Sequence, residues 1–198
     1  MRKLIPVLLI LLFAVALVMA VLMRNDSAAD TPETVKVMIA LPSDLEVVKQ
    51  MINGAQLAYN QAGGKAGDTP VELVFVNTYN PDDPADVSKD IEAANQAASD
   101  EQIVAVLAGS NSSRAQAAIP ILNQASIPMI SGTATQPSLT KPGFVAGEPG
   151  SYYPTGRRNF FRVTPSDDVQ AGVAARWMQA QDIQTVYIVA LDTPILPG

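Results

Sequence analysis

The sequence predicts an α/β fold: a parallel sheet with helices on both faces. Short apolar runs of strand length alternate with longer segments whose apolar residues recur at helical spacing. Several of the short runs are apolar throughout, which is typical of strands buried on both faces. Small polar loops follow two neighbouring runs, and ligands bind at that position in open α/β sheets. The alternation of strands and helices predicts right-handed crossover connections.

Four strands and three helices are expected between residues 35 and 131. Asp83 is the expected N-cap of the second helix, and Pro84 is expected at its first position, where proline is favoured. The expected strands are 35–40, 71–76, 103–107 and 128–131, and the expected helices are 45–61, 84–100 and 114–125.

The pattern changes after Thr140. Residues 141–159 are rich in Gly and Pro and predict a long irregular loop. Phe160–Val163 predicts a short strand, Val169–Gln181 a helix capped by Ser166, and residues 185–191 another buried strand, so a second α/β lobe is expected to begin here. The predicted division is a targeting segment at 1–24, a polar tether at 25–34, a first lobe at 35–159 that includes the irregular loop, and the start of a second lobe at 160–198.

The N-terminus reads as a targeting segment. Arg2 and Lys3 precede an uncharged apolar run, Leu4–Met23. This run exceeds the usual secretory core of about 7–15 residues and reaches the roughly 20 residues of a membrane span. Cleavage near 18–20 or 27–29 and retention as an uncleaved anchor are therefore alternatives. Either way, the body is expected at the periplasmic or extracellular face, with membrane contact only through this segment.

The composition excludes several classes of function. The chain has no Cys, so it has no disulfide, thiol nucleophile or lipid-modified cysteine. It also has no His, the commonest metal ligand and the usual general base near neutral pH. The formal net charge of -6 argues against nucleic-acid binding, which needs a basic surface. We expect neither a metal nor a cofactor.

Two polar loops carry the candidate ligand site. Residues 108–113 and 132–135 would lie at the carboxyl ends of adjacent strands. The first loop opens a helix, whose free N–H groups favour an anionic group. Hydroxyl groups can donate to a carboxylate and accept from an ammonium. The alternative is that these side chains only cap a helix and fill a turn. The candidate ligand-binding residues are Ser112, Ser113, Thr133 and Thr135.

The order and spacing of several motifs resemble the leucine/isoleucine/valine-binding proteins of ABC importers, which have the type I periplasmic-binding fold. The resemblance implies a two-lobed, non-enzymatic receptor that closes on a small amino acid or related amide and delivers it to an ABC permease. It also implies that the first lobe holds the ligand's carboxylate and ammonium through Ser112, Thr135 and a backbone group of Thr133, with Ser113 as a neighbour. The matching motifs are residues 53–58, 63–64, 80–81, 108–113, 127–140 and 161–167.

The chain departs from the family pattern at two places. Residues 41–45 are shorter than the usual glycine-rich loop and lack its aromatic residue. Residues 192–198 lack the aromatic that the family has after the matching strand, and the expectation is an N-terminal fragment without most of the second lobe. Weak or undetectable ligand binding is expected. Branched-chain amino acids are the family default, but relatives bind amides, urea and aromatic acids.

The sequence allows other interpretations of the function. A membrane-anchored sensory domain of the same fold would have the same site and a different partner. A dehydrogenase is disfavoured because residues 41–44 replace the glycine-rich turn that binds a dinucleotide. The acidic pairs at 82–83 and 167–168 fit helix starts better than metal ligands. Trp177 is expected in the core, and Tyr152 and Tyr153 at the mouth of the cleft are a lesser alternative.

Overall fold

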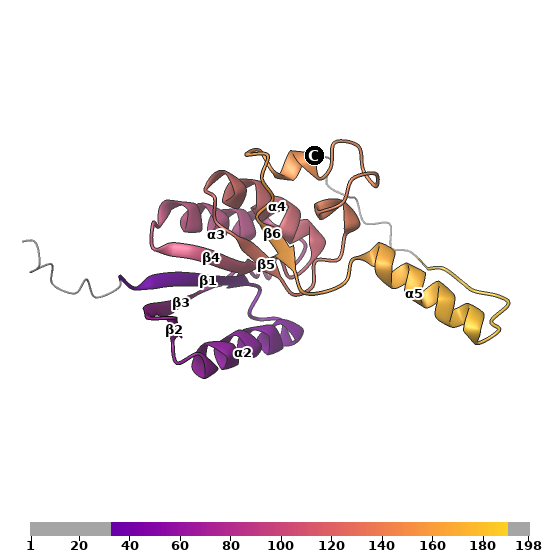
Figure 1. Ribbon diagram of the computed structural model, residues 1–198, viewed down its shortest axis with the longest axis horizontal. Coiled ribbons are helices and arrows are strands. Elements are labelled where there is room, and N and C mark those ends of the chain that lie inside the picture. The colour runs from indigo at the N-terminus through magenta and orange to yellow at the C-terminus, as the bar shows by residue number, and fades with distance from the viewer. Residues whose placement is uncertain (1–32, 190–198) are drawn as a thin grey trace, which may run out of the picture. The chain divides into compact units, whose positions relative to one another are not determined.

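A computed structural model of the chain describes residues 33–189, which contain a six-stranded sheet with helices on both faces (Figure 1). The chain divides into two units, Met1–Glu33 and Thr34–Gly198, and the description below concerns the second. Its elements are β1 (Val35–Leu41), α2 (Glu46–Gln61), β2 (Lys65–Ala66), β3 (Thr69–Asn77), α3 (Ser88–Ser99), β4 (Ile103–Ala108), α4 (Ser112–Gln124), β5 (Met129–Ser131), η1 (Pro137–Leu139), η2 (Gly150–Tyr152), β6 (Phe160–Arg162) and α5 (Asp167–Ala180).

The strands follow the order β2-β3-β1-β4-β5-β6, and all neighbours are parallel except β2 and β3. The predicted fold class is therefore confirmed. A glycine-rich stretch at residues 63–68 contains β2 and the tip of a β2–β3 hairpin, where Gly67 has a φ of 63° and so takes a conformation that glycine adopts without strain. The two-residue strand β2 has no periodicity that would have predicted it.

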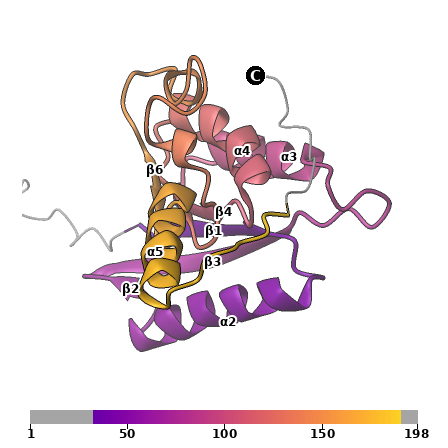
Figure 2. The same ribbon diagram turned by 90° about the vertical axis from the view of Figure 1, so that its right-hand side faces the viewer.

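The sheet has a separate apolar cluster on each face. Figure 2 shows α3 and α4 on one side of the sheet and α2 on the other. On one face α3 and α4 cover a large cluster that includes Met38, Val106 and Phe160, all less than 5% exposed. On the other face α2 packs through Val48 against Ile39 and Leu41. This two-sided burial explains why β1 and β4 are apolar along nearly their whole length.

The second helix begins later than predicted. The expected cap at Asp83 and first position at Pro84 are wrong, because α3 starts at Ser88. Asp83 instead accepts the N–H of Ala85 at 3.0 Å in a local turn. The N-cap position is Val87, and the carboxylate of Asp86 beside it accepts the N–H of Ser88 at 2.9 Å.

The last strand of the sheet lies beyond the predicted lobe boundary. β6 pairs in parallel with β5, so Phe160–Arg162 belongs to this sheet rather than to a separate one. The loop between β5 and β6 is packed rather than open. Tyr152 and Tyr153 are both 8% exposed, and the hydroxyl of Tyr153 donates to the carbonyl of Leu139 at 2.6 Å.

Two expectations about the C-terminal part are wrong. Thr185–Val189 has no regular secondary structure, and Tyr187–Val189 are more than 90% exposed. A strand needs a hydrogen-bonding neighbour, and no other strand within 33–189 pairs with this segment. Trp177 is 60% exposed instead of buried.

The predictions for 1–24, for most of the tether at 25–34 and for 190–198 lie outside the described residues. Within 33–189, no helix has both the length and the hydrophobicity needed to cross a bilayer.

Candidate ligand site at the carboxyl edge of the sheet

The loops that follow β4 and β5 are joined by hydrogen bonds at one edge of the sheet. The hydroxyl of Thr133 donates to the carbonyl of Ser110 at 2.8 Å. The N–H of Gln136 donates to the hydroxyl oxygen of Ser112 at 3.1 Å. These bonds connect residues more than 20 positions apart in the sequence. The two loops predicted to meet at the carboxyl ends of neighbouring strands therefore do lie together.

The buried side chain of Ser131 connects the two loops, although Ser131 was not among the predicted site residues. It is fully buried at the end of β5, and its hydroxyl donates to the carbonyl of Gly109 at 2.7 Å. The same oxygen accepts the N–H groups of Thr133 at 3.2 Å and Ala134 at 3.0 Å. One side chain thus sets the path of both loops, although a serine at a strand end carries no special signal in the sequence.

Gly109 is the residue that allows the first loop to turn. Its φ is +70°, a region that side chains rarely adopt. A Cβ atom here would lie 2.8 Å from Cε of Met129 and 2.9 Å from Cβ of Ala115. Glycine is therefore required both by the backbone conformation and by the close packing of β5 and α4.

The first turn of α4 presents the serines of the site. Asn111 is the N-cap, and its side chain accepts the N–H of Arg114 at 3.0 Å. Ser112 and Ser113 lie in the first turn and are not caps, which removes the capping alternative for them. The start of a helix leaves their N–H groups without intrahelical partners, and the helix dipole favours a negative charge there.

The four candidate side chains differ in their exposure and in the hydrogen-bonding groups that remain free for a ligand. Ser112 and Thr135 are half-buried, whereas Ser113 and Thr133 are exposed. The oxygen of Ser112 accepts from Gln136, so its O–H remains a donor. The hydroxyl of Thr133 donates its proton to the carbonyl of Ser110, so it could contact a ligand only as an acceptor.

Arg162 and α5 hold the second loop. The guanidinium of Arg162 donates to the carbonyls of Ala134 at 3.0 Å and Gln136 at 2.8 Å. The carbonyl of Thr135 accepts the N–H of Asp167 at 2.9 Å. These contacts occupy the carbonyls of the three residues that follow Thr133. Within residues 33–189, no donor bonds the carbonyl of Thr133 itself. Burial lowers the pKa of Arg162, which still remains charged.

A buried ion pair lies beneath the first loop. Arg114 is 2% exposed, and its guanidinium donates to the carboxylate of Asp90, which is 3% exposed. The same guanidinium donates to the carbonyls of Thr78 at 3.2 Å and Pro84 at 2.9 Å, which fixes the loop after β3 against α4. Burial raises the pKa of Asp90, and the charge of Arg114 opposes that rise.

The acidic pair at 82–83 lies in the loop before α3, and the pair at 167–168 lies in the first turn of α5. Within residues 33–189, no group of three or more acidic side chains is placed to hold a metal ion. Asp168 forms an ion pair with Lys141 at 2.7 Å, and this hydrogen bond lowers the pKa of Asp168. Ser166 occupies the N-cap position of α5 as predicted, but its hydroxyl makes no capping bond and lies against Asp168.

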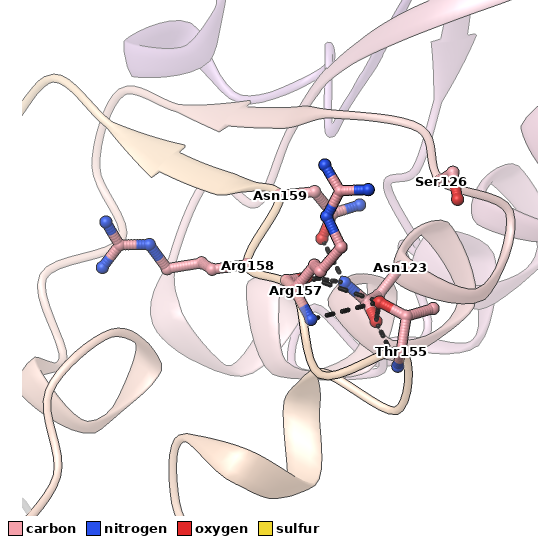
Figure 3. A pocket seen from close by; sticks show the side chains of 6 residues that line it. All are labelled: Asn123, Ser126, Thr155, Arg157, Arg158 and Asn159. Carbon is pink, nitrogen blue, oxygen red and sulfur yellow. Dashed lines mark hydrogen bonds between the residues drawn. The ribbon is translucent and has the colours of Figure 1, made fainter.

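A cavity of about 320 Å³ lies at the other edge of the sheet, near the start of β6 (Figure 3). The side chain of Asn123 lines this cavity, and its hydrogen-bonding groups are all occupied: it donates to Asn159 and to the carbonyl of Arg157, both at 2.7 Å, and accepts from Thr155. The guanidinium groups of Arg157 and Arg158 point in different directions and do not converge on one position (Figure 3). The cavity contains none of the predicted site residues.

Comparison with known proteins identifies the family. The profile of the family described as "Periplasmic binding protein" matches residues 43–195, and the chain belongs to this family. The family consists of solute-binding proteins and is not an enzyme family. Its members are exported, bind small molecules and work with ABC permeases. A search of curated proteins found no significant match.

Solved structures share this fold. An ABC transporter substrate-binding protein from Desulfitobacterium hafniense, solved in complex with Leu, is 25% identical, with a TM-score of 0.57 over 75% of this chain and 39% of that one. LivJ from Streptococcus pneumoniae, in complex with isoleucine, is 20% identical, with a TM-score of 0.57 over 74% and 38%. A solute-binding protein from Rhodopseudomonas palustris, in complex with 3,4-dihydroxybenzoic acid, is 18% identical, with a TM-score of 0.60 over 76% and 37%. The chain thus spans 37–39% of the length of these proteins.

Proposed function

We propose that this chain is the N-terminal part of the solute-binding component of an ABC importer, and that it binds a small amino acid of the branched-chain type. The observation that carries the proposal is the junction of the two loops, which brings Ser112 and Thr135 to one edge of the sheet beside a free helix N-terminus. The Leu complex of the Desulfitobacterium hafniense protein supports the choice of ligand.

The donors and acceptors at this edge suit a zwitterion. The ligand carboxylate would accept from the first-turn N–H groups of α4 and from the hydroxyl of Ser112, where the helix dipole favours negative charge. The ammonium would donate to the carbonyl of Thr133 and to the hydroxyl of Thr135. No ionised side chain of the protein is then needed, so neither charge of the ligand requires a buried counter-ion.

Binding by these loops alone should be weak. All of the proposed contacts come from one edge of one sheet, and within the described residues no second lobe closes over that edge. Ligand burial supplies much of the affinity of small-molecule sites, which usually enclose most of the ligand. We therefore expect dissociation constants of about 1 mM or weaker.

Saturation-transfer NMR with a set of leucine analogues tests this proposal. Isocaproate lacks the ammonium, isoamylamine lacks the carboxylate, and 4-hydroxybenzoate stands for an aromatic acid. We expect transfer to L-leucine and little transfer to either analogue that has lost one charged group. Equal transfer to isocaproate and leucine, or stronger transfer to 4-hydroxybenzoate, would contradict the proposed ligand class.

A further inference from the structure

Gln136 is joined through both its backbone and its side chain to one face of α4. Its N–H donates to the hydroxyl oxygen of Ser112 at 3.1 Å, and its side-chain oxygen accepts from the amide of Gln116 at 3.0 Å. Ser112 and Gln116 are four positions apart in α4 and therefore lie on the same face of the helix. Gln136, which follows Thr135 directly, thus connects the loop after β5 to the face of α4 that presents Ser112.

The groups around the side-chain nitrogen of Gln136 fix the orientation of its amide. This nitrogen donates to the hydroxyl oxygen of the fully buried Ser138 at 2.6 Å and lies 3.5 Å from the carboxylate of Glu148. An ionised carboxylate only accepts hydrogen bonds, so the amide nitrogen rather than the amide oxygen faces Glu148. The amide oxygen is therefore turned towards Gln116, which donates to it.

Glu148 is itself held by a buried tyrosine. The hydroxyl of Tyr152, which is 8% exposed, donates to the carboxylate of Glu148. Both residues belong to the packed segment between β5 and β6. Hydrogen bonds therefore run without a break from this segment through Gln136 to α4, and the members of such a network orient one another.

The remaining polar group of Gln136 is its carbonyl, which accepts from the guanidinium of Arg162 at 2.8 Å. The backbone N–H and carbonyl and the side-chain oxygen and nitrogen of Gln136 therefore all have partners within the protein. Ser112 differs, because its O–H remains free to donate. A contribution of Gln136 to ligand binding is then indirect, through the positions of Ser112 and of the loop that contains Thr135.

We propose that Gln136 is a positioning residue of the ligand site, which holds the Ser112 hydroxyl and the loop with Thr135 at the spacing that the two charged groups of an amino acid require. This inference rests on the proposed function and adds to it a residue that does not contact the ligand. Groups that are fixed before the ligand arrives lose less freedom on binding, so a preformed site binds more tightly. Without the side chain of Gln136, its N–H is no longer held over Ser112.

Amide hydrogen exchange of the full chain without ligand tests the positioning itself. Gln136→Leu keeps the approximate size of the side chain and removes its hydrogen bonds. We expect the N–H of residue 136 to exchange about tenfold faster, while the N–H of Ile39 in the central strand β1 keeps its rate. A loss of global stability alone would accelerate both amides together. Gln56→Leu is the matched control, because Gln56 donates to Asn60 on α2, away from both loops.

Exchanging the amide and the carboxylate provides the sharper outcome. Gln136→Glu alone places a second carboxylate against Glu148, and the two like charges repel each other. Gln136→Glu combined with Glu148→Gln again pairs one amide with one carboxylate and keeps an acceptor for Gln116. We expect fast exchange of the residue 136 N–H in the single variant and recovery of slow exchange in the double variant. Slow exchange in Gln136→Glu, or no recovery in the double variant, would overturn the proposal.

Titration with L-leucine, followed by NMR, separates this inference from the proposed function. We expect the dissociation constant of Gln136→Leu to be about ten times that of the unaltered chain, and that of Gln56→Leu to be unchanged. Equal affinities of Gln136→Leu and the unaltered chain would overturn the positioning role and leave the proposed function intact. Absence of leucine binding by the unaltered chain would refute the proposed function, and the positioning role would be refuted with it even where the exchange results hold.

Discussion

The hydroxyl oxygen of Ser112 accepts the backbone N–H of Gln136 at 3.1 Å, across 24 positions of sequence. This bond joins the first turn of α4 to the loop after β5. It also orients the Ser112 hydroxyl, because the acceptor side of the oxygen is occupied and the O–H is left to donate. The proposed contact with a ligand carboxylate therefore depends on a bond that exists without ligand.

Replacing Ser112 by Ala should weaken the junction of the two loops. The Gln136 N–H would lose its partner, and we expect a loss of about 1 kcal/mol in the free energy of unfolding. Ser113→Ala is the matched control, because Ser113 is the exposed neighbour in the same helical turn. Urea denaturation followed by circular dichroism measures both. Equal stability of the two variants would show that the Ser112 bond does not hold the loops together.

Removing one partner of the buried pair Arg114–Asp90 should be much more costly. Asp90→Asn leaves the guanidinium buried without its counter-charge, and we expect a loss of about 3–5 kcal/mol. Combining Arg114→Met with Asp90→Leu should recover part of that loss. The exposed pair Lys49–Glu46 is the control, and Lys49→Met should cost at most about 0.5 kcal/mol. Similar losses at the two pairs would contradict the role given to burial.

Replacing Gly109 by Ala should strain the first loop in two ways. The new Cβ atom would meet Ala115 at 2.9 Å and would also force a positive φ on a residue with a side chain. We expect a loss of about 2–4 kcal/mol from crowding and backbone strain together. Gly156 has a φ of +73° with nothing within 4 Å, so Gly156→Ala isolates the backbone contribution. Thermal unfolding that ranks Gly156→Ala as the more damaging change would refute the packing argument.

Asp86 should make stability depend on acid pH. Hydrogen bonds from Ser88 and Asn80 lower the pKa of Asp86 from 3.8 to about 2. The folded state therefore binds this proton less readily than the unfolded state, so the stabilisation is complete above pH 4 and is lost as pH falls towards 2. In Asp86→Asn, the urea concentration at the midpoint of unfolding should depend less on pH between these two values. Asp82→Asn, at an exposed carboxylate of the same loop, should leave the slope unchanged; the opposite ranking would reject the assignment.

The strands and helices around the site could be predicted because their signals are local. β4, α4 and β5 each have a periodicity that their own residues define, and the order of strands then places two loops at one edge. The start of α3 could not be predicted so well, because Asp83 and Asp86 carry similar capping signals and only hydrogen bonds to Asn80 and Ser88 distinguish them.

The remaining differences depend on contacts distant in sequence. Ser131 and Arg114 organise the site from buried positions, but nothing in their neighbouring residues distinguishes them from ordinary polar residues. The helical spacing of the apolar residues around Trp177 predicts an apolar face on this helix. The spacing does not identify the surface that this face packs against. The same is true of residues 185–189, whose composition is that of a strand and whose pairing depends on a neighbour.

Amide-resolved NMR of the isotope-labelled chain during titration with L-leucine tests the central claim most directly. At millimolar leucine we expect shifts concentrated at Ser112, Ser113, Thr133 and Thr135, and we expect Ser112→Ala to reduce them. Amides around Asn123 and Arg157, at the cavity on the opposite edge, should not move. Unchanged amides in both loops, or shifts centred on that cavity, would contradict the proposal that this edge of the sheet holds the amino acid.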